Sequence, residues 1–170
     1  MPWRPMMDVL RLVSLMLATV SMGLVAGVFG FYAHTVMPGL ARAGDRTFVG
    51  AFQSLDRAII NPWFIGGQFV GALVFTLVAA VSHIGETALQ PIVAALLLYA
   101  GTSLITVRVN VPLNDEIKAA GDPDSIADLA AVRAQFDEAR WMRWNLVRVL
   151  ASTLAFTLLA WSLVLSGRAA

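Results

Sequence analysis

The 170-residue sequence contains no cysteine, which excludes disulfide bonds, thiolate metal sites and a cysteine nucleophile. Charged residues are also scarce: they make up 14% of the chain, against roughly 25% in an ordinary soluble domain, whereas apolar residues make up 58%. The 12 basic and 11 acidic residues nearly balance, so there is no electrostatic reason to expect a nucleic-acid partner. These deficits argue against a soluble enzyme, a nucleic-acid-binding protein or a disordered tail, and they favour a membrane protein.

Lysine, arginine, aspartate and glutamate are all missing from four windows, residues 12–41, 58–85, 87–107 and 149–167. A helix needs about 20 mainly apolar residues to cross roughly 30 Å of hydrocarbon. The windows lack charge on every face and do not alternate with a period of two, which argues against a soluble amphipathic core and against transmembrane strands. The sequence therefore predicts a single all-α domain over residues 1–170. We expect an integral membrane four-helix bundle with helices at about 9–37, 62–82, 88–109 and 146–166.

The first window also fits a cleaved signal peptide, because Arg4 and Arg11 precede an apolar run. The run is longer than a usual signal sequence and Asp8 lies in its leading segment, so we expect this helix to remain in the protein.

The ends of the inner helices carry recognisable signals. The second helix is expected to begin at Asn61-Pro62-Trp63, where asparagine caps free amides and proline fits the first turn. The third helix should end near Val111, since Pro112 disfavours helical angles in the residue before it. Residues 124–140 have a helical apolar pattern, which predicts an amphipathic helix on the membrane surface, in the loop between helices 3 and 4.

The charged segments between the windows indicate the orientation in the membrane. Five charges lie in residues 42–57 and thirteen in residues 108–148, which are the connections after the first and third helices. That side holds nine basic residues, and the other side holds three, Arg4, Arg11 and Arg168. Because Lys and Arg favour the cytoplasmic side, we expect both long loops to be cytoplasmic and both termini outside, in an inner or plasma membrane.

Glycines and a histidine share one stripe of the first helix. Gly23, Gly27, Gly30 and His34 follow at i, i+4, i+7 and i+11. Small residues at this spacing let membrane helices approach closely, inside the bundle or between two copies in a homo-oligomer. An ionisable side chain on such an inward face is a candidate functional group. A neutral hydrogen-bonded histidine, or one that reaches the headgroups, explains the residue equally well.

Metal, nucleophile and phosphate sites have little support in the sequence. The second histidine, His83, lies beside Glu86 in the short connection at the opposite membrane face, where a solvated loop is expected. A helix crossing separates it from His34, so the two histidines cannot share an ion. There is no G-x-S-x-G sequence, and the glycines lie in apolar segments rather than in a phosphate-binding loop. No metal ion is therefore expected.

The remaining polar residues gather at the predicted cytoplasmic end of the bundle. Trp141, Trp144 and Arg148 lie at i, i+3 and i+7, so one helical face carries two indoles and a guanidinium. An aromatic belt with a snorkelling arginine explains that pattern, but it does not require several asparagines at the same depth. Those amides either tie the loops to the bundle or line a pocket for a flat, partly polar ligand. The group comprises His34, Asp56, Arg57, Asn61, Asn110, Asn114, Asp115, Trp141, Trp144, Asn145 and Arg148.

Three sequence segments stand in order between the hydrophobic windows: N-P-W-F at 61–64, N-V-P-L-N-D at 110–115 and W-x-x-W-N-x-x-R at 141–148. Together with the glycine-rich first helix that leads to His34 and M-P-G-L at 37–40, they resemble the anthrone oxygenase family of small membrane proteins. Many members of that family are known only as a domain of unknown function. The resemblance extends over nearly the whole chain.

The resemblance implies oxidation of a polycyclic anthrone to an anthraquinone with dioxygen, without a metal or flavin cofactor. The central methylene of an anthrone is acidic because its carbanion is aromatic, so the protein need only supply a base, donors for the enolate oxygen and a dry cavity. His34 is then the expected base, since histidine titrates close to neutral pH. Asn110, Asn114 and Arg148 are expected to hold the enolate or peroxide oxygen. The residues expected to bind the substrate are Asn61, Trp141, Trp144 and Asn145.

Two other functions are compatible with the sequence. A non-catalytic membrane module, such as a small subunit, would use the glycine faces and loops to bind a hydrophobic ligand or a partner protein. A transporter of four helices without intramembrane carboxylates would have to oligomerise. In each case the lipid bilayer is the first expected partner and a small hydrophobic aromatic ligand the second.

Overall fold

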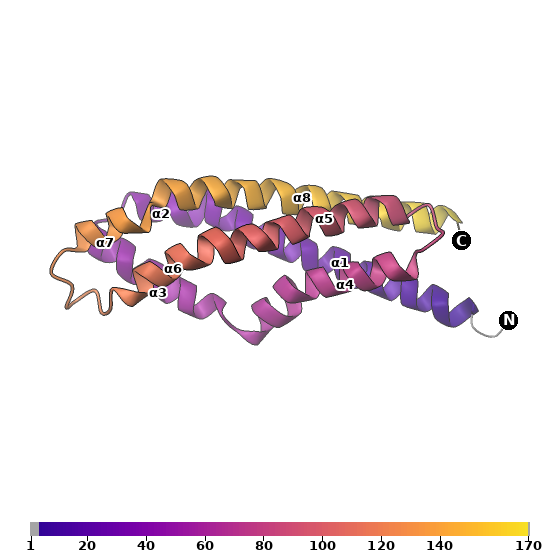
Figure 1. Cartoon of the computed structure of the whole chain (residues 1–170), viewed down its shortest axis with the longest axis horizontal. Coiled ribbons are helices and arrows are strands. Elements are labelled where there is room, and N and C mark those ends of the chain that lie inside the picture. Colours follow the sequence, from indigo (N-terminus) through magenta and orange to yellow (C-terminus); the bar gives the residue numbers. More distant parts are fainter. Residues whose placement is uncertain (1–3, 170) are drawn as a thin grey trace.

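The computed structural model describes residues 4–169, and helices joined by short connections make up this part of the chain (Figure 1). Three short segments, labelled η, are π-helical and continue neighbouring α-helices. The elements are α1 (Arg4–Phe31), η1 (Tyr32–Val36), α2 (Met37–Ala41), α3 (Asp45–Ile59), η2 (Trp63–Val70), α4 (Gly71–Ser82), α5 (Leu89–Ile105), η3 (Thr106–Asn110), α6 (Val111–Ala119), α7 (Leu129–Phe136) and α8 (Glu138–Ala169).

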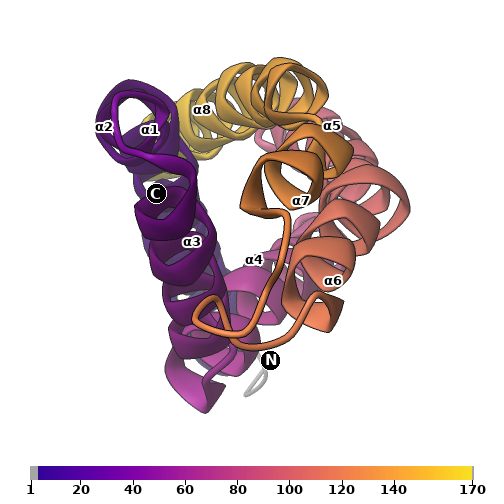
Figure 2. The same cartoon turned by 90° about the vertical axis from the view of Figure 1, so that its left-hand side faces the viewer.

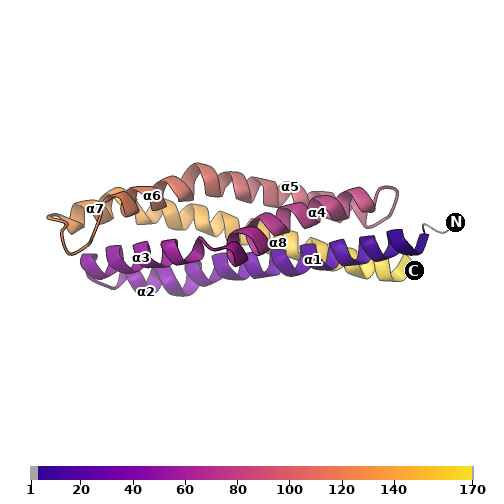
Figure 3. The ribbon, with the colours of Figure 1, turned by 90° about the horizontal axis from the view of Figure 1, so that it is seen from below.

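Four helical stretches are long enough and apolar enough to cross a membrane, which confirms the predicted all-α membrane bundle. They cover Pro5–Ala41, Trp63–Ser82, Leu89–Ala119 and Leu129–Arg168. Both ends of the chain lie at one end of the bundle, and the long connections lie at the other (Figures 1 and 3). The charged segments 42–57 and 108–148 therefore come together at this second end, which we call the loop end.

Apolar side chains at a helical period hold the membrane half together. α1 packs against α4 and α8, and α5 packs against α8. The buried positions of α1 are bulky, whereas many facing positions are alanines, so the helices approach closely. The buried α1 residues are Leu15, Ala18, Met22, Val25 and Phe29, and the alanines include Ala72, Ala79, Ala95 and Ala155.

The glycine stripe of α1 is not its main packing face within the chain, which corrects the prediction that it packs inside the bundle. Contact between two copies through this stripe stays a prediction. Only Gly23 lies against a neighbour, because a methyl group added there would stand 2.9 Å from the Phe156 ring. Gly27 and Gly30 have open space beside them, and His34 is exposed. The bulky side chains of α1 make van der Waals contacts with the small residues of α4 and α8, so that face turns inward.

The third span was predicted to end near Val111, before Pro112, and this prediction is wrong. The helix continues through η3 and α6 to Ala119. A proline lacks an amide, and its ring crowds the carbonyl four residues earlier. For Pro112 this is the carbonyl of Arg108 within η3, and for Pro38 it is the carbonyl of His34 within η1. The wider π-helical turn accommodates each proline without breaking the helix.

Additional helices close the loop end. α3 forms where the sequence indicated only a charged connection, and its buried Phe52 packs against Phe136 of α7 with ring centroids 4.5 Å apart. The surface helix predicted over residues 124–140 is shorter in the structure, where α7 covers Leu129–Phe136. α7 lies over the end of the bundle (Figure 2), and its Phe136 is buried there. Asp137 adopts a left-handed conformation that separates α7 from α8, so the last helix begins at Glu138.

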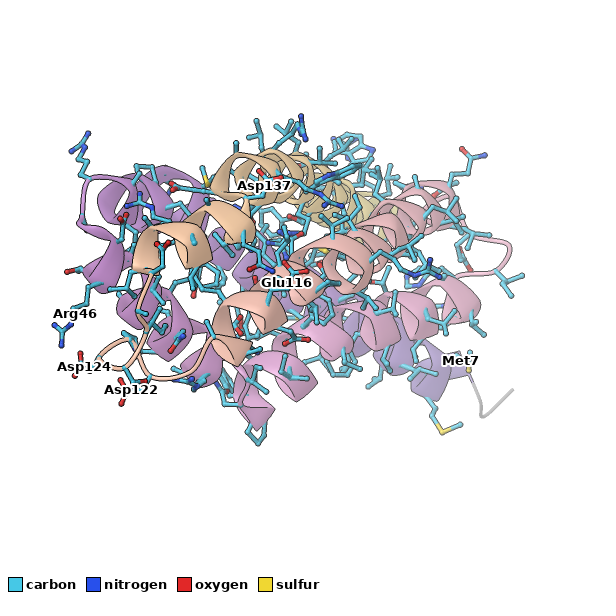
Figure 4. All side chains as sticks on the ribbon, turned by 60° about the vertical axis from the view of Figure 1, so that its left-hand side comes forward. Met7, Arg46, Glu116, Asp122, Asp124 and Asp137 are labelled. Atoms are coloured by element: carbon cyan, nitrogen blue, oxygen red, sulfur yellow. The ribbon has the colours of Figure 1, made fainter. Side chains whose placement is uncertain are left out.

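Ion pairs tie down both ends of the bundle. At the loop end, Arg46 of α3 pairs with Asp124 of the α6–α7 connection (Figure 4). At the opposite end, Arg11 pairs with Glu86 at 2.9 Å. His83 was expected in a solvated loop, but it is buried, with Nδ1 2.7 Å from the carbonyl oxygen of Ala79. The short α4–α5 connection thus packs down onto α1.

Candidate functional site

A pocket of about 190 Å³ lies at the loop end, where the π-helical segments meet α3 and α6. An apolar cavity of about 150 Å³ is enough to hold a benzene ring, so this pocket accommodates part of a fused aromatic system. All three π-helical segments contribute to its lining, through residues that include Tyr32 of η1, Ile65 of η2 and Val107 of η3. π-helical turns are rare and often occur at functional sites.

Arg148 of α8 forms the polar centre of the inner wall. Its side chain is buried, and Nη2 donates to Oδ1 of Asn145 at 2.7 Å while Nη1 donates to Oγ1 of Thr106 at 3.2 Å. The guanidinium carbon lies 4.3 Å from the centroid of the Phe29 ring and 5.5 Å from a ring centroid of Trp141. Within residues 4–169 no carboxylate pairs with Arg148, and its Nε has no hydrogen-bond partner. A buried cation without a counter-ion is costly, so a ligand oxygen with negative charge would be stabilised here.

Asp56 of α3 forms a second polar group on the opposite side of the pocket. Its Oδ1 accepts a hydrogen bond from Nδ2 of Asn114 at 2.6 Å, and its Oδ2 lies 2.7 Å from Nζ of Lys118. Asn114 in turn accepts a hydrogen bond from Nε1 of Trp141 at 2.8 Å. Lys118 also pairs with Asp115 at 3.0 Å. The network connects α3, α6 and α8 at the point where the pocket meets the charged end of the bundle.

The two remaining asparagines of the motifs link helices. Asn145 lines the pocket and donates through Nδ2 to the carbonyl oxygen of Phe29 at 3.1 Å, which joins α8 to α1. Asn110 lies just behind the lining, with Nδ2 3.5 Å from the carbonyl oxygen of Trp141. Its Oδ1 is buried without a hydrogen-bond partner.

The structure brings together about half of the residues expected at the site. Asn114, Trp141, Asn145 and Arg148 line the pocket.

Four expected residues lie outside the pocket lining: His34, Asn61, Asn110 and Trp144. His34 is exposed, with Nδ1 2.6 Å from Oγ1 of Thr35. Asn61 accepts a hydrogen bond from the amide of Phe64 at 2.9 Å, which confirms its predicted capping role.

Several lining residues were not selected from the sequence. Asp56 and Asp115 were placed at this end without a role, and Lys118 was not considered, although it follows Asp115 by one helical turn. Phe29 and Tyr32 belong to the buried face of the first span, three residues apart, which is the signal that would have found them. In the described part of the chain, no group of three or more metal-ligating side chains could hold an ion.

Residues 61–158 match the family model described as anthrone oxygenase, which is more than half of the chain. The chain belongs to the anthrone oxygenase family. The matched region contains all three motif segments and the pocket residues of η2, η3, α6 and α8. Two further pocket residues of this anthrone oxygenase family member lie before the matched region. They are Phe29 of α1 and Asp56 of α3. Comparisons with curated proteins and with solved structures give no match.

Proposed function

We propose that the pocket oxidises a polycyclic, anthrone-like aromatic molecule to a quinone with dioxygen. The observation that supports this most is Arg148, a buried guanidinium without a carboxylate partner in a largely aromatic wall. Preorganised donors that face a developing negative charge are usually the largest source of catalytic stabilisation. The guanidinium of Arg148, which lines the pocket, is the donor group that we assign to the enolate oxygen of the substrate.

Asp56 is the proposed base. It is buried, it lines the pocket, and each of its two oxygens keeps a lone pair beyond the contacts to Asn114 and Lys118. It takes one proton from the central methylene, and the negative charge moves to the oxygen near Arg148. A guanidinium at this position lowers the cost of forming the anion in a site from which water is excluded.

Dioxygen completes the reaction without a further reductant. The enolate transfers one electron to dioxygen, and the two radicals combine into a peroxide on the former methylene carbon, which takes up one proton. Loss of water then breaks the O–O bond as the second methylene proton leaves, and a carbonyl group forms. One oxygen atom becomes the quinone oxygen and the other leaves as water, so the substrate loses two hydrogens and gains one oxygen.

The charge distribution also supports an orientation. We place the loop end, and therefore the pocket, on the cytoplasmic side of an inner or plasma membrane, with both termini outside. Nine basic residues lie on the loop side and three on the other, a bias that follows the cytoplasmic preference of Lys and Arg.

Oxygen uptake by the detergent-purified protein with an emodin-type anthrone, in the presence of a chelator, tests the proposal. We expect uptake above the spontaneous rate and a loss of about 10²-fold or more in Arg148→Gln, as for removal of an oxyanion donor. Asp56→Asn should lose most of the activity as well. Glu116→Gln, an exposed carboxylate on α6 outside the pocket, is the matched control.

The same assay separates the two candidate bases. His34→Ala should keep full uptake, because the side chain is exposed and lies outside the pocket lining. Full activity in Arg148→Gln, or loss of activity confined to His34→Ala, would contradict the assignment. Gel filtration of each variant checks that the protein remains folded.

A further inference from the structure

The exposed apolar residues of the pocket lining lie close to η2 and η3. Four apolar lining residues are exposed, and we call them the mouth residues: Ile60, Ile65, Val107 and Val111, with exposed fractions of 60%, 38%, 58% and 40%. Ile60 follows α3 and Ile65 lies in η2, whereas Val107 lies in η3 and Val111 begins α6. The lining residues of α8 on the opposite wall are buried. The pocket therefore opens between η2 and η3.

Helix divergence explains why the opening is there. α4 and α5 pack against each other in the membrane half, but their continuations η2 and η3 separate toward the loop end (Figure 1). On the other sides of the bundle, α1 and α5 each pack against α8. The mouth lies between two membrane spans that separate from each other. An apolar opening at this position leads directly to the lipid.

An aromatic layer covers the pocket along the bundle axis. Phe52 of α3, Phe136 of α7 and Trp141 of α8 form this layer through contacts between their rings, and all three side chains are almost completely buried. The ring centroids of Phe52 and Trp141 lie 5.8 Å apart. A large ligand therefore cannot pass along the bundle axis without displacing this layer.

The mouth lies at the edge of the hydrocarbon. Val107 is the last residue of the charge-free window 87–107, which at 1.5 Å per residue spans about 30 Å, the thickness of the hydrocarbon core. Ile65 lies within the window 58–85, beside the exposed Trp63, a residue type that anchors helices at the interface. Val107, Val111 and Asp115 all line the pocket and follow one another along the chain, so the mouth is apolar on the membrane side and charged on the water side.

We propose that the pocket takes its ligand laterally from the bilayer through the mouth between η2 and η3. The ligand is a flat aromatic molecule that is dissolved in the membrane and has one polar edge. Its apolar rings cross Ile65 and Val107, and its polar edge faces Arg148 and the charged end of the pocket. The route rests on the proposed function because it concerns the same pocket. It adds that the substrate enters from the membrane phase.

The cysteine-free chain permits a reversible test. In Ile65→Cys/Val107→Cys, a bis-methanethiosulfonate reagent of graded spacer length bridges the mouth, and a reducing agent opens it again. The probe is an azidoanthraquinone in lipid vesicles, which is photolysed and then located on the protein by mass spectrometry. The matched control is Val78→Cys/Leu97→Cys, on exposed faces of the packed helices α4 and α5.

Bridging should lower the labelling of residues 138–148 by about tenfold when the probe is added afterwards, because its association is blocked. Probe added before bridging should remain bound after transfer to probe-free vesicles, and reduction should restore exchange. The control should label as the unmodified protein does. Equal labelling with the mouth bridged, loss of the preloaded probe, or no labelling of this segment in the unbridged protein would each overturn the route.

The probe is already a quinone, so labelling does not depend on oxidation. Labelling controlled by the mouth together with no oxygen uptake would retain the route and refute the proposed function. Oxygen uptake together with labelling that bridging does not change would retain the proposed function and refute the route.

Discussion

Replacing Lys118 by methionine tests whether the Asp56 carboxylate is a buried charge that depends on its partner. The two side chains are 20% and 9% exposed, and Nζ lies 2.7 Å from Oδ2. Without the ammonium, the carboxylate keeps only the hydrogen bond from Asn114. Removing one partner of a buried ion pair costs about 3–5 kcal/mol. Because Lys118 is partly exposed and Asn114 remains, we expect the lower end of that range.

The reverse substitution should cost less. In Asp56→Asn the lysine still pairs with Asp115, which lies 3.0 Å from Nζ, so a loss of about 1–2 kcal/mol is expected, as for one buried hydrogen bond. In the double variant Asp56→Asn/Lys118→Met no buried charge remains. Its cost should therefore fall short of the sum of the single costs by about 2 kcal/mol.

Thermal unfolding in detergent micelles, followed by tryptophan fluorescence, measures these differences. For a domain of this size 1 kcal/mol corresponds to about 2–4 °C, so Lys118→Met should lower the Tm by about 6–12 °C. Arg143→Met, an exposed cation of α8, is the control and should unfold with the wild type. A double variant whose loss equals the sum of the two single losses would refute the reasoning, because the two charges would then act independently.

Two further outcomes follow from the packing and the orientation. Gly27→Ala should raise the free energy of unfolding by about 0.5–1 kcal/mol, because the methyl group meets nothing within 4 Å. Gly23→Ala should give no such gain, since its methyl group would stand 2.9 Å from the Phe156 ring; equal gains in thermal unfolding would contradict this packing. Ser125→Cys, exposed in the α6–α7 connection, should react with an impermeant maleimide in inverted vesicles and not in intact cells. Reaction in intact cells would place the loop end outside.

The membrane-spanning part of the fold could be predicted because hydrocarbon tolerates so little charge. The windows 12–41 and 149–167 fall within helical spans of the structure, the window 58–85 contains the span Trp63–Ser82, and the window 87–107 overlaps the third span from Leu89 onward. This constraint ends at the interface, where polar and apolar residues mix again. α3 was missed for that reason: four charges accompany its buried Phe48 and Phe52, and the segment resembles a solvated connection.

The site was harder to predict because it depends on helical phase. A spacing of i, i+4 or i+7 identifies a shared face only while the turn stays regular. η1 includes His34, so the face assigned to that residue from the α-helical spacing of the glycines was wrong. Arg148 and Trp141 were found because α8 runs as an uninterrupted α-helix through both of them.

Arg148 links the membrane half of the protein to the chemistry of the pocket. It precedes a charge-free window of 19 residues, a position at which an arginine ordinarily extends toward water and headgroups. Here the side chain instead turns inward, to 5% exposure, over the Phe29 ring and onto Asn145. The amide of Asn145 already joins α8 to α1 through the Phe29 carbonyl, so this contact between helices does not require the charge. A buried guanidinium that has no carboxylate partner in the described part of the chain, beside an apolar mouth, supports the proposal that the ligand supplies an anionic oxygen.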